Sequence, residues 1–460
     1  MFLESIILSK RNLFWVVFHV VLGIISTVTP FALIFWFYLI LISNFNNAIF
    51  QLRKGKSFDY IALVTYLSTF EMLGRMAKTD PFIPAELSKY FLPIFSIIGV
   101  SNSPKKGNNL WLILGALITI SVLFDYSGQR KFFDIINNYF GTLALILGLH
   151  FLNKQYIGYK FIDILLQLIM FSILPCLIYC FIKTPNFEDI SFTLSANFET
   201  SGGAATNQVS TVFGLGLFLS FYFWYKRIHF SGYRLIDILL GIAFLVQGLL
   251  TFSRGGIVVS IICIFILVLI NTNNFKPRNI ILTIFSIFAV FFIFNIIDDF
   301  TGGKLLLRYQ GETEGTYNYG VEKDLKKMTS GRSLIFEEDL KLWFSHPIFG
   351  VGVGASRYIR GGMEGSTISS HIELSRLLAE HGVFGLVFFI YLINLGINLW
   401  RNIKIESWRL ILFIMYLIAI LTSLHSAMRT FVTPLLIALS SIGMYNVKKK
   451  AANVIIHRSN

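Results

Sequence analysis

The chain has 460 residues, of which 55% are hydrophobic and only 14% are charged. Its mean hydropathy of +0.68 exceeds that of soluble globular domains and excludes that class. The composition therefore predicts an integral membrane protein. Because backbone groups inside a bilayer must be hydrogen-bonded within the chain, helices are the expected element.

Apolar stretches near spanning length recur along the chain. The first two are together too long for a signal peptide and lack a small-residue cleavage site, so we expect two spans that break near Pro30. Several stretches are short, which favours about 12 to 14 transmembrane helices in an all-α polytopic membrane protein. The stretches are 13–28, 30–48, 60–76, 89–100, 110–124, 137–152, 161–182, 208–225, 235–252, 255–270, 280–297, 383–400, 409–423 and 428–446.

Basic residues gather in alternate loops between these stretches. This pattern fits the positive-inside rule, with both termini in the cytoplasm. The formal charge of +14 then reflects topology, and nucleic-acid binding is not expected. The basic residues assigned to the inner side are Lys10, Arg11, Arg53, Lys54, Lys56, Lys105, Lys106, Lys154, Lys160, Lys226, Arg227, Arg234, Lys276, Arg278, Arg401, Lys404, Arg409, Lys448, Lys449, Lys450 and Arg458.

The same alternation divides the chain into four regions. We expect N-terminal transmembrane helices over 1–297, a long outer (periplasmic) loop over 298–382, C-terminal transmembrane helices over 383–447 and a basic cytoplasmic tail over 448–460. A long ordered loop in a compact protein is usually functional. The loop is therefore the first place to look for chemistry.

The three cysteines all lie inside apolar runs. Cys176, Cys180 and Cys263 have no spacing typical of a disulfide framework or a zinc site. We expect them to be small core residues.

The long loop has distinct parts. Its beginning shows no lasting helical period before Val321. A helix is then predicted with Ser333 as its cap and Pro347 as its end. The sequence "GVGVG" at 350–354 favours a tight packing turn over a phosphate-binding loop. Leucines in "SSHIELSRLLAEHGVFG" at 369–385 predict a further helix before the next apolar run.

Six arginines are predicted on the outer side of the membrane. Their planar guanidinium groups suit phosphate oxygens. The carboxylates show no Asp-x-Asp grouping of the kind expected for a metal-dependent sugar-nucleotide transferase, so no metal site and no cofactor is expected. A lipid-linked pyrophosphate donor fits both the apolar spans and these arginines. The six are Arg254, Arg332, Arg357, Arg360, Arg376 and Arg429.

Three segments in order resemble the O-antigen ligase and polymerase family of bacterial envelope proteins. They are "FSRGG" at an outer helix end, "GRSLIFEEDLKLWFSHPIFGVGVG", and "SSHIELSRLLAEHGVFG" before an apolar span. The resemblance covers roughly 240–400. It implies inverting, metal-independent glycosyl transfer on the periplasmic face of the inner membrane, in lipopolysaccharide or surface-glycan assembly. The implied donor is a glycan on undecaprenyl pyrophosphate, and the implied acceptor is a glycan, lipid A-core or protein hydroxyl.

The resemblance also implies roles for individual residues. Arg254 and Arg332 match the arginines that hold the pyrophosphate, and His371 matches the loop histidine proposed as the base. Glu373 is the rival base. Ile372 stands where family members often have asparagine, so an acceptor-orienting amide is not in its usual place.

Further substrate-binding candidates lie around these residues. "SLHSAMRTF" supplies an outer histidine and arginine, and the arginines of the loop add to them. "TNQ" at 206–208 replaces a more familiar proline-asparagine pair, which leaves the role of its asparagine open. His346 is interpreted as a turn residue and His381 as a charge near a helix end. The additional candidates are Arg357, Arg376, His425, Arg429 and Asn207.

Other classes of function stay open at this point. A transporter or lipid-linked glycan flippase should show paired repeats and ionisable residues near mid-membrane, and neither pattern is evident. A non-catalytic scaffold for envelope assembly is a third possibility. Within the transferase class, a loop ordered around an opening that admits a bulky acceptor favours a ligase over a polymerase.

Overall fold

The computed structural model describes residues 12–185, 190–270, 277–318, 329, 331–360, 370–403 and 409–445. The predicted basic tail at 448–460 lies outside the described residues. Every apolar stretch predicted as a span contains an α-helix. Within these described residues, four helices are long and apolar enough to cross a membrane, and four shorter apolar helices accompany them. The prediction of an all-α polytopic membrane protein is confirmed.

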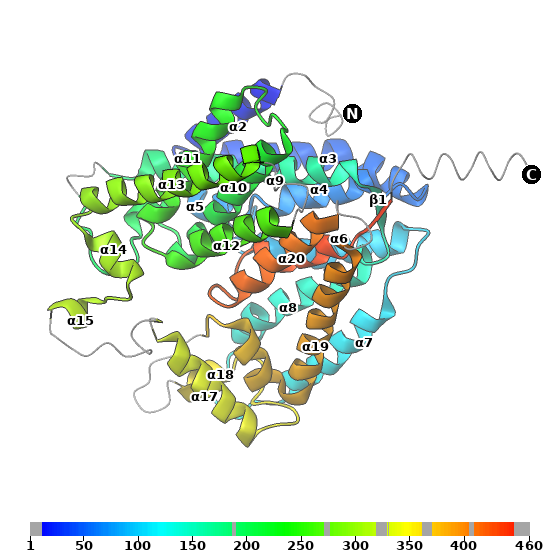
Figure 1. Cartoon of the computed structure of the whole chain (residues 1–460). Helices are drawn as coiled ribbons and strands as arrows, with labels where there is room; N and C mark the ends of the chain where they lie inside the picture. Colours follow the sequence, from blue (N-terminus) through cyan, green and yellow to red (C-terminus); the bar gives the residue numbers. More distant parts are fainter. Residues whose placement is uncertain are drawn as a thin grey trace, which may run out of the picture.

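The first part of the chain is an almost continuous series of helices (Figure 1). A break between Ser26 and Phe31 separates the first two, as the proline at 30 predicts. The elements are α2 Asn12–Ser26, α3 Phe31–Arg53, α4 Phe58–Ser68, α5 Glu71–Ala77, α6 Leu87–Asn102, α7 Asn109–Thr119, the 3₁₀ helix η1 Ile120–Leu123, α8 Phe132–Leu152, α9 Lys160–Lys183, the 3₁₀ helix η3 Glu199–Ser201, α10 Thr206–Lys226, α11 Arg234–Leu250, α12 Arg254–Ile270 and α13 Pro277–Phe300.

The remaining elements form the long loop and the C-terminal helices. Figure 1 shows α14, α15, α17 and α18 at one end of the molecule, away from β1. These elements are α14 Lys304–Tyr309, α15 Glu314–Asn318, α17 Arg332–Ser345, α18 Ser356–Arg360, α19 Glu373–Ile403, α20 Leu410–Ser423 and α21 Val432–Ser440, with strands β1 Tyr156–Gly158 and β2 Gly443–Tyr445.

Two expected spans differ from the prediction. The stretch 60–76 is divided, because α4 ends at Ser68 and α5 begins at Glu71. The last stretch, 428–446, contains only the short helix α21 before the chain becomes extended. Its strand β2 pairs in parallel with β1, with Tyr156 opposite Gly443. This pairing joins the end of the described chain to the connection between α8 and α9.

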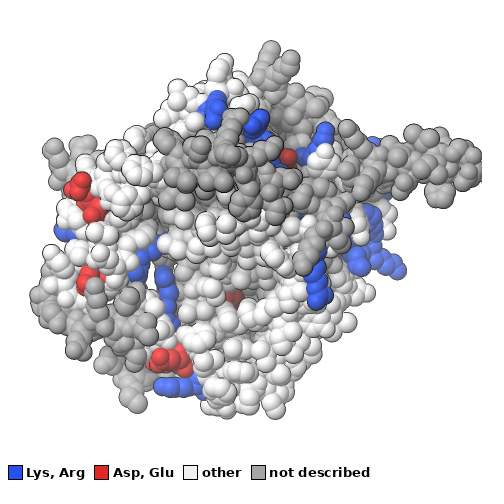
Figure 2. All heavy atoms as spheres, viewed as in Figure 1, with Lys and Arg blue, Asp and Glu red and all other residues white. Residues whose placement is uncertain are grey.

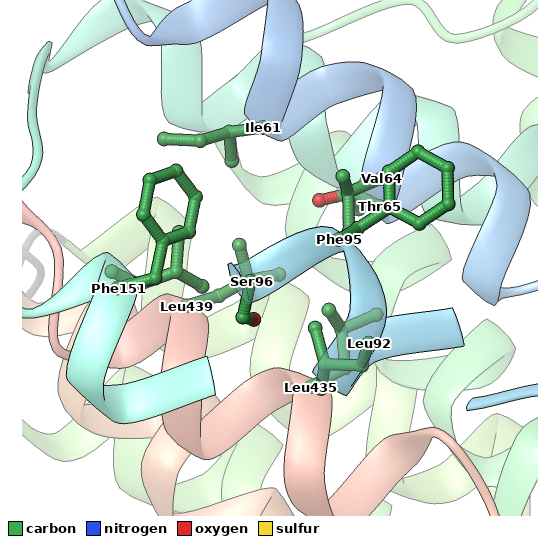
Figure 3. Close-up of a pocket in the computed structure, with 10 residues that line it drawn as sticks. Ile61, Val64, Thr65, Leu92, Phe95, Ser96, Phe151, Leu435 and Leu439 are labelled. Carbon is green, nitrogen blue, oxygen red and sulfur yellow. The ribbon is translucent and has the colours of Figure 1, made fainter. Parts of the chain in front are cut away.

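The helical core is closely packed. The helices α4, α6, α8 and α21 leave a cavity of only about 10 Å³ between them (Figure 3). Its lining is mainly apolar, with the hydroxyl-bearing side chains of Thr65 and Ser96 among leucine and phenylalanine. The three cysteines are buried and unbridged, as predicted.

Two details of the loop differ from the prediction. The region before Val321 is not without helix, because α14 and α15 form there. Ser333 is not the cap of α17, which begins at Arg332 after Gly331. Instead, the Ser333 amide donates to the hydroxyl of Thr329 over 3.2 Å.

The "GVGVG" segment is a packing turn, as favoured from the sequence. Gly350 and Gly352 have φ values of +70° and +98°, which other residues rarely adopt. A side chain at Gly350 would clash with the backbone at Glu380, and one at Gly352 would clash with the carbonyl of Phe124. The turn therefore fixes the loop against α19 and against the residue that follows η1.

Candidate functional site

The site begins at the N-terminus of α12, where two glycines follow Arg254. A side chain at Gly256 would clash with the backbone of Ser210 in α10, and one at Gly255 would clash with the ring of His425. The close approach that glycine allows therefore brings the start of α12 against α10 and the α20–α21 turn. This packing brings Arg254 and His425 into the same site.

Asn207 supports this junction. Its side-chain oxygen accepts a 2.7 Å hydrogen bond from the hydroxyl of Ser253, the residue before Arg254. Its backbone oxygen accepts from Thr211, and the Thr211 hydroxyl is 3.2 Å from Nε2 of His425. Asn207 thus ties α10 to the residues on either side of the site.

Three arginines from different elements meet here. Arg254 starts α12, Arg308 lies in α14 and Arg332 starts α17. Burial lowers the pKa of Arg308 to about 10, with Arg254 and Arg332 as further causes. Burial also lowers the pKa of Arg332, and Arg254 adds to this effect. Figure 2 shows basic side chains along a hollow between α14 and the end of α12, above α17.

Tyr309 lies beside this arginine cluster, which we define as Arg254, Arg308 and Arg332. Its ring packs edge-on against Phe294 of α13, with centroids 5.3 Å apart. Burial raises the pKa of its hydroxyl, and the positive charge of Arg254 opposes that rise. The hydroxyl is buried and has no hydrogen-bond partner among the described residues.

His371 lies next to the arginine cluster, just before α19. Burial is the main cause that lowers its pKa to about 4, followed by the charges of Arg429 and Arg332 and by His425. Arg429 donates a 3.0 Å hydrogen bond to the carbonyl of Ser370, which fixes the residue before His371. The histidine is therefore neutral at pH 7 and can accept a proton.

His425 is the second histidine of the site. Burial lowers its pKa to about 4, with Arg332 as the next cause. Its Nδ1 is 3.3 Å from the carbonyl of Leu421 and its Nε2 faces Thr211. Both ring nitrogens of His425 lie near polar groups of the protein. This distinguishes His425 from a histidine that is free to act as an acid or a base.

The other predicted arginines lie in a separate group of ion pairs. Arg376 pairs with Glu373 and, over 3.1 Å, with Glu380. Arg357 pairs with Asp134 over 3.1 Å. Arg360 pairs with the buried Asp339, which also accepts from Ser375. The structure does not place these three arginines in the arginine cluster.

This second group also bears on the rival base. The carboxylate of Glu373 contacts Arg376 and accepts from the Met428 amide over 3.3 Å. Both of its oxygens therefore have partners within the fold. The two remaining histidines lie elsewhere: His381 hydrogen-bonds Ser121 over 2.6 Å, and the His346 ring packs 4.2 Å from that of Tyr126.

Arg308 and Tyr309 were missed by sequence reasoning. They end the run "KLLLRY", and the three leucines before Arg308 were the available signal, since a charged residue after an apolar turn near the membrane needs a polar neighbour. The helix itself has six residues, too few for periodicity to show.

The arrangement can bind a polyanion and accept a proton beside it. Arginine stays charged throughout, so the arginine cluster can stabilise phosphate groups before and after a bond breaks. A neutral histidine in the same site can act as a general base. Such a pairing is suited to displacement of a phosphate leaving group by a hydroxyl.

Comparison with known proteins supports this reading. No curated protein matches the chain. Residues 238–390 match the family model described as O-antigen ligase. This range includes Arg254, Arg308, Arg332 and His371, and excludes Asn207, His425 and Arg429. The match supports the resemblance seen in the sequence, and residues 238–390 of this chain are similar to the O-antigen ligase family.

Proposed function

We propose that this protein is a membrane glycosyltransferase that moves a glycan from undecaprenyl pyrophosphate to an acceptor hydroxyl, in the manner of an O-antigen ligase. The observation that carries the proposal is the meeting of Arg254, Arg332 and His371 in one site. The family match supports a role in membrane glycan assembly. The reaction takes place on the periplasmic face of the inner membrane.

The arginines are assigned to the leaving group. As the bond between the anomeric carbon and the pyrophosphate oxygen breaks, negative charge develops on the lipid pyrophosphate. Buried, positively charged guanidinium groups stabilise that charge more strongly than water-exposed ones. No step requires a metal ion, because arginine supplies the positive charge.

His371 is assigned to the acceptor. The acceptor oxygen attacks the anomeric carbon from the face opposite the pyrophosphate, so the configuration inverts. His371 takes the hydroxyl proton as the new bond forms. His425 and Arg429 are proposed to shape the acceptor side, since both lie close enough to His371 to lower its pKa.

The decisive experiment is complementation of a deletion strain, read as glycan banding on a gel. The wild-type chain should restore glycan on its acceptor. Arg332→Ala and His371→Ala should leave full-length lipid-linked polymer behind. Lys341→Ala is the matched control, because Lys341 is an exposed cation on the same helix as Arg332.

The other outcomes have distinct meanings. Accumulation of single lipid-linked repeat units would identify a polymerase, which joins repeats at the same kind of site. Loss of lipid-linked glycan from the outer face would identify a flippase. Full activity of both variants would remove the proposed residues from the mechanism and leave a scaffold role.

A further inference from the structure

Arg308 differs from the other outer arginines in its surroundings. Arg357, Arg360 and Arg376 each pair with a carboxylate. The Nε of Arg308 is buried and has no hydrogen-bond partner within the part of the chain that the structure describes. Its charged neighbours are themselves arginines, Arg254 and Arg332. The fold therefore places the positive charge of Arg308 beside two other positive charges that repel it.

Specific contacts of the neighbouring residues fix the position of Arg308. The carboxylate of Asp298 accepts a 2.7 Å hydrogen bond from the Leu306 amide, which holds the first turn of α14 to the end of α13. Leu305 is fully buried, and Lys304 donates to the carbonyl of Phe192. Three contacts thus fix a six-residue helix whose fifth residue, Arg308, carries the charge.

Like charges held close together repel one another, and a polyanion is the ligand that offsets this cost. A glycan on a lipid pyrophosphate is a diester and carries two negative charges. When the bond to the sugar breaks, the electron pair stays on the pyrophosphate oxygen. The lipid pyrophosphate that leaves then gains a third negative charge. Three arginines match the leaving group better than two.

We propose that Arg308 contacts the pyrophosphate together with Arg254 and Arg332, and that it stabilises the charge gained by the leaving group. This inference rests on the proposed function for its chemistry. The hollow beside α14 (Figure 2) gives the anion its entry. Arg308 would then be a catalytic residue of the transfer step as well as an anchor for the released product.

The first test measures binding of inorganic pyrophosphate to the purified full-length protein in nanodiscs by calorimetry. Wild type should bind pyrophosphate more tightly than orthophosphate. Arg308→Ala should weaken pyrophosphate binding roughly 10- to 100-fold, as expected for loss of a charge-assisted hydrogen bond. Arg308→Lys should retain most of the affinity, and Lys341→Ala should bind like wild type.

The second test follows glycan transfer by the same proteins. Arg308→Ala should lower kcat by roughly 10²- to 10³-fold, as removal of other charge-stabilising donors does. The KM for the donor should rise less, because the donor carries one charge fewer than the leaving group. A purely structural role would instead lower the melting temperature of Arg308→Ala and Arg308→Lys alike.

The results show whether this inference or the proposed function fails, because the two can fail independently. Wild-type affinity for pyrophosphate in a folded Arg308→Ala protein overturns the inference, even if glycan transfer is confirmed. So does failure of wild type to bind pyrophosphate. If wild type transfers no glycan but binds pyrophosphate through Arg308, the proposed function fails and the anion site stands.

Discussion

At the scale of single residues, His371 shows how surroundings select a protonation state. Half-buried beside Arg429 and Arg332, it has a pKa lowered to about 4 and is neutral at pH 7. We expect His371→Ala to reduce transfer by roughly 10²- to 10⁴-fold, the usual contribution of a general base. The measurement is the initial rate of the purified protein with saturating donor.

Two controls make this result specific. His346→Ala removes a histidine from the same loop, where its ring packs on Tyr126, and should leave the rate near that of wild type. Pyrophosphate binding should persist in His371→Ala, because the arginines are intact. An unchanged rate in a folded His371→Ala protein would contradict the assignment of the base.

The lowered pKa values also predict a pH profile. His371 must be neutral to accept a proton, so kcat/KM should be level near pH 7 and fall as the pH drops through about 4. A bound pyrophosphate raises the pKa of the histidine, so kcat should fall at a higher pH than kcat/KM. A rate that declines as the pH rises from 5 to 8 would argue against a neutral histidine base.

Stability at low pH must be measured beside the rate. His371 and His425 both have pKa values lowered from 6.5 to about 4 in the fold. The unfolded chain therefore binds more protons between these values, and the free energy of unfolding should decrease as the pH falls through this window. Melting temperatures at each pH distinguish unfolding from loss of the base.

At the scale of elements, the glycines at the start of α12 set the position of Arg254. Gly255→Ala places a methyl group against the ring of His425, and Gly256→Ala places one against the backbone of Ser210. Both should lower the melting temperature, because a packed interior cannot accept the added volume without strain. Combination of Gly255→Ala with His425→Ala should recover stability, whereas Gly256→Ala should not be rescued in this way.

A second element-scale feature is the ion-pair group at the start of α19. Arg376 lies between Glu373 and Glu380, and all three side chains are buried. Arg376→Ala leaves two buried carboxylates together, which typically costs about 3–5 kcal/mol of unfolding free energy. We expect loss of stability measured by thermal unfolding. A folded variant with only a raised KM for the donor would instead support the sequence-based assignment of Arg376 to substrate binding.

The sequence predicts helices best where the membrane imposes their length. Apolar stretches such as 161–182 are recognisable because a span needs about 20 apolar residues. The helix α14 is not recognisable, because its six residues are held by Asp298 and a buried Leu305 and not by local periodicity. The turn of the last stretch into β2 depends on β1, which is remote in sequence.

For the site too, local sequence features are recognisable, whereas contacts between distant elements are not. Charged residues at predicted helix ends mark Arg254 as a candidate, and the family resemblance implies roles for Arg254, Arg332 and His371. The sequence cannot tell that Arg357 pairs with Asp134 or Arg360 with Asp339, because these contacts join distant elements. Residue type therefore predicts the chemistry, and tertiary contacts decide which residues carry it.

At the scale of the whole molecule, the distribution of charge predicts which end faces the cytoplasm. Loops rich in lysine and arginine should face inward, and the arginine cluster should face outward with α14 and α17. Cysteine labelling can test this directly, because the three native cysteines are buried and contribute little background. Lys56→Cys reports on one side of the membrane and Lys341→Cys on the other, since both lysines are exposed.

The expected result follows from the charge rule. In intact spheroplasts, a membrane-impermeant maleimide should label Lys341→Cys and not Lys56→Cys, and disruption of the membrane should make both reactive. The reverse pattern would put the arginines and His371 on the cytoplasmic side. Sugar nucleotides are available as donors in the cytoplasm. The location of the site would then no longer favour a lipid-linked pyrophosphate as the donor. The orientation of the molecule thus decides which donor the arginine cluster can meet.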